Sequence, residues 1–264
     1  MCRHLAYLGP PVPLAALLVG PPHSLLHQSW APRDMRGGGT INADGFGIGW
    51  YPSPGSAPVR YRRDRPIWTD EGLVQLAGVT VAGAMLAAVR SATPGMALAE
   101  AACAPFAEGA WLFSHNGVVA GWPDSVTAPA RALPLSDLLT LDAPTDSALL
   151  WALVRHRLRA GAPPGDAIAA TVSEVLTVAP GSRLNLLLCD GHRIVASSCG
   201  HALSVRAADG AVTVASEPLD DDPRWREVPD GHLLIATTDT VDLCPLWSVG
   251  GPTSTVELLT WGES

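Results

Sequence analysis

Lysine is missing from this sequence, and all 17 of its basic residues are arginine. Without a lysine amine the chain cannot form a lysine Schiff base, anchor pyridoxal phosphate or supply the lysine of a nucleotide-binding P-loop. Acidic residues outnumber the arginines, 25 to 17, and the formal net charge is −8. This balance argues against general binding of polyanions. We therefore expect neither nucleic acid nor an anionic membrane as a partner.

Long apolar runs and paired cysteines are also lacking. No apolar stretch approaches 18 residues without turn formers, and the chain does not open with the basic and apolar regions of a secretory signal. We therefore expect a cytoplasmic protein. The five cysteines are scattered and contain no Cys-x-x-Cys pair, which argues against a disulfide framework and a cysteine-rich zinc module. We expect neither a metal nor a cofactor. The sequence leaves open whether the protein forms a homo-oligomer.

The length and the order of the predicted elements favour one domain over residues 1–264. Apolar or alternating segments bounded by turn residues predict strands early and late in the chain, with two amphipathic helices between them. The predicted strands lie within residues 1–9, 42–51, 80–90, 110–119, 183–198, 203–215 and 232–238, and the predicted helices span about 145–158 and 164–178. This order predicts an α+β domain in which two sheets pack between helices.

One predicted strand, residues 42–51, has glycine at every second position: Gly45, Gly47 and Gly49. The spacing is Gly-x-Gly-x-Gly and no helix follows, so the segment is not a dinucleotide-binding motif. Glycine on one face of a strand leaves that face bare. We therefore expect another sheet, helix or backbone to approach this face closely.

Cys2 follows the initiator methionine, and a small side chain at this position commonly allows that methionine to be removed. Cys2 would then carry both a thiol nucleophile and a free α-amine. An α-amine has a pKa of about 7.7–8.0 and a thiol one of about 8.5, so the amine can accept the thiol proton without a partner histidine. The alternative is that Cys2 is a small buried hydrophobic residue at the start of an apolar strand.

Two further segments carry groups suited to binding negative charge. Arg90 ends a predicted strand and precedes a turn, where its planar guanidinium is well placed to hold a carboxylate. Asn116 and Gly117 offer a side-chain amide and an unhindered backbone N–H, the two donors that an oxyanion hole requires. The alternative for this Asn-Gly pair is a hairpin turn.

Taken together, four motifs resemble those of the N-terminal-nucleophile (Ntn) hydrolases of the class II glutamine amidotransferase type. They are Met-Cys at the start, Arg90-Ser91-Ala92-Thr93, His115-Asn116-Gly117, and Thr145-Asp146-Ser147 at the start of a helix. The resemblance implies a four-layer αββα sandwich of two mainly antiparallel sheets between helices. The chain departs from the family pattern at Ser91 and Pro94, where tryptophan and histidine are common.

The resemblance also implies a reaction with a catalytic set of Cys2, Asn116 and Gly117. Cys2 Sγ attacks the carbonyl of a γ-glutamyl amide, its own amine relays the proton, and the other two residues hold the oxyanion. A γ-glutamyl thioester forms and is hydrolysed to glutamate. The implied substrate-binding residues are Arg90, Thr93, His115 and Asp146. Of these, the first two are assigned to the glutamyl α-carboxylate and the last to the α-ammonium.

Within this family the chain is similar to the small stand-alone members that cleave γ-glutamyl amides. Residues 42–51 and 216–220 carry this similarity. It implies a small-molecule substrate, γ-glutamyl hercynylcysteine sulfoxide of ergothioneine biosynthesis, which would be cleaved to glutamate and hercynylcysteine sulfoxide.

Two other functions stay open on the sequence alone. A glutaminase subunit that delivers ammonia to a partner synthase would carry the same motifs, because it cleaves the same type of bond. A non-enzymatic zinc protein is the second alternative. Its ligands would be Cys2 and His4 together with His23 and His27, which are four residues apart and would share a helix face.

Overall fold

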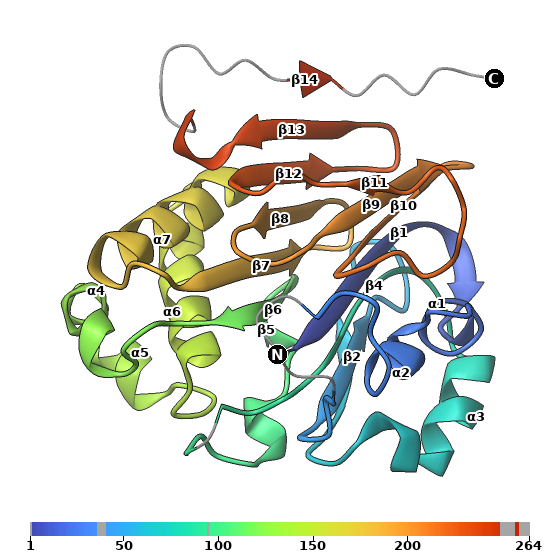
Figure 1. Ribbon diagram of the computed structural model, residues 1–264, viewed down its shortest axis with the longest axis horizontal. Helices are drawn as coiled ribbons and strands as arrows, with labels where there is room; N and C mark the ends of the chain where they lie inside the picture. The colour runs from blue at the N-terminus through green and yellow to red at the C-terminus, as the bar shows by residue number, and fades with distance from the viewer. Residues whose placement is uncertain (1, 36–40, 94, 249–256, 259–264) are drawn as a thin grey trace.

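The computed structural model describes residues 2–35, 41–93, 95–248 and 257–258 (Figure 1). Met1, whose removal we expect, and Pro94 lie outside the described residues. Within them, two antiparallel sheets of seven strands each pack against one another, and helices cover both outer faces. The predicted αββα sandwich is confirmed.

The first sheet, sheet A, is built around β1 (Arg3–Pro13). Six consecutive residues from Arg3 to Leu8 are buried, as expected for a strand that is covered on both faces. The strand order is β11-β9-β10-β1-β4-β2-β3. The bounds of the other strands are β2 (Phe46–Trp50), β3 (Val59–Arg63), β4 (Val81–Val89), β9 (Ser204–Ala208), β10 (Ala211–Ala215) and β11 (Arg226–Glu227).

The second sheet, sheet B, has the order β14-β13-β12-β8-β7-β6-β5. Its strands are β5 (Phe106–Glu108), β6 (Trp111–Val118), β7 (Arg183–Cys189), β8 (Ile194–Ser198), β12 (His232–Ala236), β13 (Val241–Pro245) and β14 (Glu257–Leu258). Asn116 and Gly117 lie inside β6, paired with Asn185 and Leu184 of β7. The hairpin-turn alternative for this Asn-Gly pair is therefore wrong, because the pairing with β7 continues through both residues.

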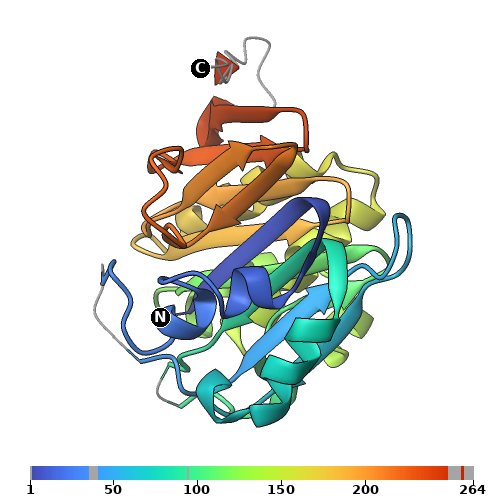
Figure 2. The ribbon, with the colours of Figure 1, turned by 90° about the vertical axis from the view of Figure 1, so that its right-hand side faces the viewer.

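Short helices cover sheet A, and they lie in front of it in the view of Figure 2. They are α1 (Ala15–Leu18), α2 (Leu25–Gln28) and α3 (Glu71–Val79). Sheet B is covered by α4 (Thr127–Arg131), α5 (Leu135–Leu139), α6 (Asp146–Arg159) and α7 (Pro164–Val178). Single 3-10 turns are η1 (Ile67–Thr69), η2 (Glu100–Ala102), η3 (Asp124–Val126) and η4 (Leu246–Ser248). None of the described helices has the length and apolarity needed to cross a membrane.

The layer between the two sheets determines which side chains meet. Ala6 and Leu8 of β1 pack there against Leu112 of β6, whereas Leu5 and Tyr7 face the helices of sheet A. This alternation is the period of two that a strand imposes. His4, Ala6 and Leu8 of β1 therefore face sheet B, before the register of the strand shifts between Leu8 and Val12.

The predicted bare face of the glycine-rich strand is confirmed in β2. A Cβ atom on Gly47 would lie 2.3 Å from the carbonyl oxygen of Ala104, and one on Gly49 would lie 2.7 Å from a Leu112 methyl carbon. Glycine is required at both positions because the segment that enters β5 and strand β6 approach β2 so closely.

Candidate active site

The antiparallel pairing of β1 determines the surroundings of Cys2, which directly precedes this strand. Arg3 is paired with Val89 of β4, so Cys2 lies next to Arg90, the first residue after that strand. On the other side of β1, the backbone N–H of Ser216 donates to the His4 carbonyl at 2.9 Å. Cys2 is half-buried and its thiol is free. The nucleophile predicted from the sequence thus lies between the ends of β4 and β10.

Alternation along three strands directs the candidate side chains to the same layer. Cys2 shares the sheet-B side of β1 with His4, whose Nδ1 forms a hydrogen bond of 2.6 Å with Ser114 Oγ on β6. Asn116 lies two residues beyond Ser114 and therefore faces the same layer. Arg90 follows Ala88 by the same step of two at the end of β4. The structure therefore directs Cys2, Arg90 and Asn116 toward one region between the sheets.

Asn116 is completely buried, and its side chain is held by a residue that the sequence did not single out as a site residue. Its Nδ2 donates to Ser216 Oγ at 3.4 Å, and the same Oγ accepts the backbone N–H of His4 at 3.0 Å. A carboxamide nitrogen carries two hydrogens, so one is left for an oxyanion. Ser216 belongs to the 216–220 segment that carried the subfamily similarity, which was the only sequence signal for it.

Gly117 could not carry a side chain in this sheet. A Cβ atom there would lie 1.8 Å from the carbonyl oxygen of Arg183 on β7 and 2.5 Å from His115 Nε2. Both distances are far below van der Waals contact. The absence of a side chain at the expected oxyanion donor is therefore a packing requirement of the strand pair β6–β7.

Arg90 is buried, and the adjoining loop holds its guanidinium. Nη2 donates to the Ala97 carbonyl at 2.9 Å, and the backbone N–H donates to the Gly45 carbonyl at 2.7 Å. The Asp44 carboxylate accepts the backbone N–H of Ala92 at 2.8 Å and thereby fixes the chain after Arg90. Thr93 is exposed at the start of the same loop.

Asp146, the first residue of α6, connects the helix to the end of β6. Its Oδ2 accepts the backbone N–H of Val119 at 3.1 Å, and its Oδ1 accepts the N–H of Ser147 at 2.7 Å. The preceding Thr145 caps the helix, because its hydroxyl accepts the N–H of Ala148 at 3.2 Å. Asp146 thus contacts Val119, two residues after Gly117 in the chain, as a carboxylate at the positively polarised amino-terminal end of a helix.

His115 faces away from Asn116. Its Nδ1 forms a hydrogen bond of 3.0 Å with Ser147 Oγ of α6, and its Nε2 forms one of 3.0 Å with the Arg183 carbonyl. Since neighbouring residues of a strand point to opposite faces, a side chain at 115 cannot share the layer of Asn116. This geometry favours a role of His115 in joining β6 to α6 over direct contact with a substrate.

Two buried histidines near the nucleophile have strongly lowered pKa values and are therefore neutral near pH 7. Burial, with neighbouring His115, His201 and Arg3, lowers the pKa of His4 to about 3. Burial and Arg183 lower the pKa of His201 to about 4, and Arg183 Nε donates to its Nε2 at 3.0 Å. The arginines therefore provide the positive charge in this region, and such charge favours an anionic intermediate or carboxylate ligand.

The zinc alternative is not supported. His4 is bound to Ser114, whereas His23 and His27 contact each other edge to face, with ring centroids 5.6 Å apart. In the described parts of the chain, which include all four proposed ligands, no three histidine, cysteine or acidic side chains are grouped to hold a metal ion.

An αββα sandwich with a cysteine at the start of a central strand defines the class of Ntn-type amidotransferase domains. The sequence profile of the class-II glutamine amidotransferases matches residues 22–208. Since this match covers well over half of the chain, the protein belongs to the class-II glutamine amidotransferase family. The resemblance noted from the four motifs is thereby confirmed.

Two relatives within the family match this chain over their whole length. The γ-glutamyl-hercynylcysteine sulfoxide hydrolase of Mycolicibacterium smegmatis is 42% identical over 246 residues, which cover 93% of this chain and 100% of the relative. The protein of the same name from Mycobacterium tuberculosis H37Rv is 41% identical over 254 residues, 96% of this chain and 100% of the relative.

Solved structures show the same fold at lower identity. A class-II glutamine amidotransferase domain protein from Silicibacter pomeroyi gives a TM-score of 0.63 at 23% identity, covering 93% of this chain and 99% of that chain. The glutamine phosphoribosylpyrophosphate amidotransferase of Bacillus subtilis gives a TM-score of 0.65 at 18% identity, covering 93% of this chain and 49% of that chain. At these identities the likeness concerns the fold alone.

Proposed function

We propose that the protein hydrolyses a γ-glutamyl amide through an amino-terminal cysteine, with γ-glutamyl hercynylcysteine sulfoxide as the substrate and glutamate and hercynylcysteine sulfoxide as products. One observation supports the mechanism: β4 pairs with β1 in sheet A and β6 of sheet B packs against β1, so Cys2 before β1, Arg90 after β4 and Asn116 near the end of β6 face the same region. The substrate is proposed from the two relatives that match over their full length and bear its name.

Removal of Met1 starts the proposed cycle because it converts the Cys2 nitrogen from an amide into a basic amine. The amine accepts the thiol proton, and the sulfur forms a bond to the γ-carbonyl carbon. The carbonyl electron pair moves onto oxygen. Asn116 Nδ2 and the Gly117 N–H donate to that oxyanion, the first through the hydrogen not used by Ser216.

Collapse of this tetrahedral intermediate breaks the C–N bond, and the Cys2 ammonium returns its proton to the leaving nitrogen. A γ-glutamyl thioester and a free amine result. Water then attacks the thioester carbon, with its proton taken by the Cys2 amine, and the second collapse releases glutamate and restores the thiol. No further acid or base is needed, which agrees with neutral His4 and His201 near the nucleophile.

The glutamyl group would be held through its two charged ends. Arg90 is the proposed partner of the α-carboxylate, by turning its guanidinium from the Ala97 carbonyl toward the ligand, and Thr93 is a second donor on the same loop. Asp146 is the proposed partner of the α-ammonium, since an ionised carboxylate can accept further hydrogen bonds beyond those from Val119 and Ser147.

The decisive experiment controls the chemical state of the Cys2 nitrogen. The chain is produced with a removable amino-terminal extension, and glutamate release from γ-glutamyl hercynylcysteine sulfoxide is measured before and after the extension is cut off. We expect activity only when cutting exposes Cys2 as the first residue, verified by intact mass. A matched protein in which cutting leaves one glycine before Cys2 should stay inactive. Full activity of the glycine-extended protein would refute the proposed proton transfer.

The same assay separates this function from the glutaminase alternative. Glutamine and γ-glutamyl hercynylcysteine sulfoxide are compared without any partner, with Cys2→Ala as the inactive control and Cys244→Ser, a substitution at a half-buried thiol on β13, as the active one. A higher kcat/KM for glutamine would favour ammonia delivery to a synthase.

A further inference from the structure

His4 is a buried histidine beside the nucleophile that takes no part in the proposed proton transfers. Its side chain points into the layer between the sheets, where Nδ1 shares a hydrogen bond of 2.6 Å with Ser114 Oγ of β6. Nε2 is also buried, and no atom of the described residues forms a hydrogen bond with it. Burial lowers the pKa of His4 to about 3, so the ring is neutral near pH 7. A polar atom that is buried without a partner costs free energy, so Nε2 needs an explanation.

The hydroxyl group of Ser114 determines which nitrogen of His4 carries the proton. Ser114 is completely buried, and the contact with Nδ1 is the only hydrogen bond that its side chain makes within the described part of the chain. If the hydroxyl donates to Nδ1, its hydrogen is satisfied and the ring proton lies on Nε2. A proton on Nδ1 would instead leave the buried hydroxyl hydrogen without an acceptor. The neutral ring therefore carries its proton on Nε2, and this atom is a donor.

The matching acceptor is the carboxamide oxygen of Asn116. This residue is completely buried, and its Oδ1 likewise accepts no hydrogen bond from the residues that the structure describes. Asn116 faces the same layer as His4, because it lies two residues after Ser114 on β6. Ser216 Oγ contacts both residues, through the His4 backbone N–H at 3.0 Å and through Asn116 Nδ2 at 3.4 Å. An unpaired donor and an unpaired acceptor thus share one buried region of the layer.

We infer that His4 is a positioning residue for the oxyanion donor and that one buried water molecule joins its Nε2–H to Asn116 Oδ1. The two atoms are not hydrogen-bonded to each other, and a bridging water satisfies polar groups that are too far apart for direct contact. Buried waters typically bind where polar groups inside a protein would otherwise be unpaired. This inference rests on the proposed amidohydrolase activity, because it concerns the geometry of that oxyanion site.

The carboxamide needs this second contact because its bond to Ser216 is long. The distance of 3.4 Å exceeds the usual range of an N–H···O hydrogen bond, about 2.7–3.2 Å. A half-turn of the carboxamide would exchange its nitrogen and its oxygen, and an acceptor would then face the oxyanion. A water that accepts from Nε2–H has both of its own hydrogens left to donate, so it favours a carbonyl oxygen as its neighbour. It thereby keeps Asn116 Nδ2 available to the oxyanion.

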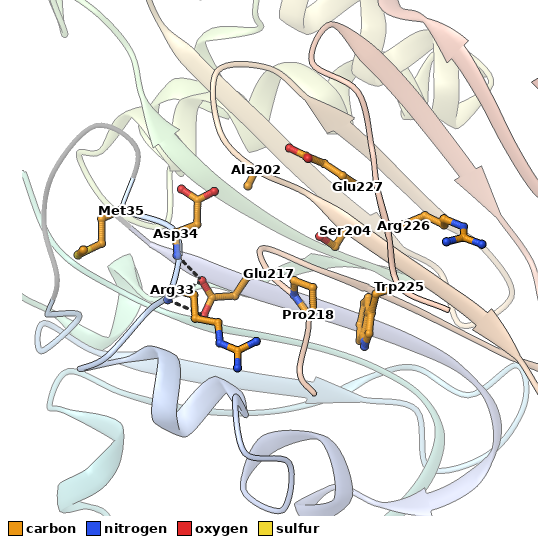
Figure 3. A pocket seen from close by; sticks show the side chains of 10 residues that line it. All are labelled: Arg33, Asp34, Met35, Ala202, Ser204, Glu217, Pro218, Trp225, Arg226 and Glu227. Atoms are coloured by element: carbon orange, nitrogen blue, oxygen red, sulfur yellow. Dashed lines mark hydrogen bonds between the residues drawn. The ribbon is translucent and has the colours of Figure 1, made fainter. Parts of the chain in front are cut away.

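The Ser216 side of this network is held in place by the next residue. The buried Glu217 carboxylate accepts the backbone N–H groups of Arg33 at 3.0 Å and Asp34 at 2.9 Å, and both bonds are drawn in Figure 3. The chain at Ser216 therefore has little freedom to follow a rotating carboxamide. The orientation of Asn116 then depends on the group that meets its oxygen.

Two substitutions of His4 separate the roles of its ring nitrogens. The amide of asparagine is attached to Cγ, as Nδ1 is, whereas the amide nitrogen of glutamine lies two bonds beyond Cγ, as Nε2 does. His4→Gln therefore retains a donor near the position of Nε2, and His4→Asn retains only the contact with Ser114. We expect His4→Asn to lower kcat about tenfold with KM nearly unchanged, because a distant hydrogen bond to the donor is lost. His4→Gln should retain most of the rate.

The experiment measures steady-state glutamate release from γ-glutamyl hercynylcysteine sulfoxide by the mature enzyme and its variants. His192→Asn and His192→Gln, at an exposed position between β7 and β8, are the matched controls and should behave as the parent. In the Asn116→Ala background, His4→Asn should cause no further loss of kcat, because the two residues act together. Equal rates for the two His4 variants, or a faster His4→Asn, would show that the imidazole only joins β1 to β6. Additive losses with Asn116→Ala would equally overturn the inference.

Nuclear magnetic resonance tests the same assignment in the unsubstituted protein. With ¹⁵N-labelled histidine, correlations between ring protons and ring nitrogens show which nitrogen of His4 is protonated, and the signal lost in His4→Gln identifies the residue. We expect the proton on Nε2, with a cross-peak from it at the frequency of water. A proton on Nδ1, or an Nε2 proton without a water contact, would refute the bridge. Absence of γ-glutamyl hydrolysis in the parent enzyme would instead count against the proposed function, so the two failures are distinguishable.

Discussion

Asn116 and Ser216 lie 100 residues apart in the chain and are joined by a buried hydrogen bond of 3.4 Å from the carboxamide Nδ2 to the hydroxyl oxygen. The same hydroxyl accepts the backbone N–H of His4 and donates to the His4 carbonyl at 3.3 Å. Ser216 therefore connects β1, which carries the nucleophile, to the proposed oxyanion donor on β6. We assign it a positioning role, since the oxyanion itself is reached by Asn116.

Replacing Ser216 by alanine should slow catalysis without weakening substrate binding. The carboxamide loses the acceptor that orients it, and we expect kcat to fall about tenfold with KM nearly unchanged. Asn116→Ala should cost about 10²–10³ in kcat, as for the loss of one oxyanion donor. Steady-state kinetics of the single and double variants provide the measurement.

The double variant distinguishes positioning from general destabilisation. If Ser216 acts through Asn116, removing both should cost no more in kcat than Asn116→Ala alone, because the two effects are coupled. Ser216→Thr, which retains the hydroxyl, should recover part of the lost rate. Additive losses in the double variant would show that Ser216 does not act through the carboxamide.

Gly117 should tolerate no side chain. In Gly117→Ala the added Cβ would lie 1.8 Å from the Arg183 carbonyl, so β6 and β7 would have to separate where Asn116 is held. We expect the free energy of unfolding to fall by about 3 kcal/mol and activity to be lost with it.

The matched control for this prediction is Gly78→Ala in α3, where an added Cβ meets no atom within 4 Å. Alanine is the better helix former, so this variant should be more stable by about 0.5–1 kcal/mol. Urea unfolding of both variants and the parent gives the comparison. A stable, active Gly117→Ala enzyme would contradict the close approach of the two strands.

The sequence was sufficient to predict the local parts of the site. Arg90 could be placed at the end of a strand because the residues before it are apolar over strand length, and the start of a helix near Thr145 and Asp146 could be predicted from the amphipathic segment that follows. Each of these inferences needs only neighbouring residues. They agree with the structure because propensity and burial favour the same element there.

The contribution of Ser216 could not be predicted in the same way. Its contact with His4 joins residues separated by 212 positions, and it exists only because β10 pairs with β1. The orientation of His115 could have been predicted from the sequence, because neighbouring residues of one strand point to opposite faces and His115 directly precedes Asn116. The Asn-Gly pair obscured this, because on its own it favours a turn.

Stability should depend on pH through two buried histidines. Folding lowers the pKa of His4 to about 3 and that of His201 to about 4, from 6.5 in the unfolded chain. At a pH between the folded-state and unfolded-state pKa values, the unfolded chain binds more protons than the folded protein does. The contribution of these histidines to stability is therefore complete above pH 6.5 and is lost as the pH falls toward 4. Each histidine contributes a slope of at most about 1.4 kcal/mol per pH unit.

Urea unfolding at several values between pH 4.5 and 8 measures this slope, and His201→Gln should reduce it by about half. At pH 8 the imidazole is neutral in both states, so the variant should show only its lost packing and its lost hydrogen bond with Arg183. The stability difference from the parent should then shrink as the pH falls. Parallel pH profiles for the two proteins would rule out His201 as a contributor.

Selective alkylation should identify Cys2 as the reactive thiol. Burial raises the pKa of Cys103 to about 11 and that of Cys189 to about 12, and it also raises the pKa values of Cys199 and Cys244. Since the thiolate is the reactive form, these four should react slowly at pH 7.5. Limiting iodoacetamide should therefore add one carbamidomethyl group, at the amino-terminal residue, and activity should fall in proportion to labelling.

Peptide mass spectrometry identifies the labelled cysteine, and two variants test whether labelling of Cys2 causes the loss of activity. Cys2→Ser should incorporate far less reagent over the same time, whereas Cys244→Ser, which removes the half-buried thiol on β13, should match the parent in both labelling and inactivation. Since Cys103, Cys189 and Cys199 are buried, their modification would require local opening of the fold. Inactivation that follows labelling of one of these buried thiols, with Cys2 still unmodified, would contradict the assignment of the amino-terminal sulfur as the nucleophile.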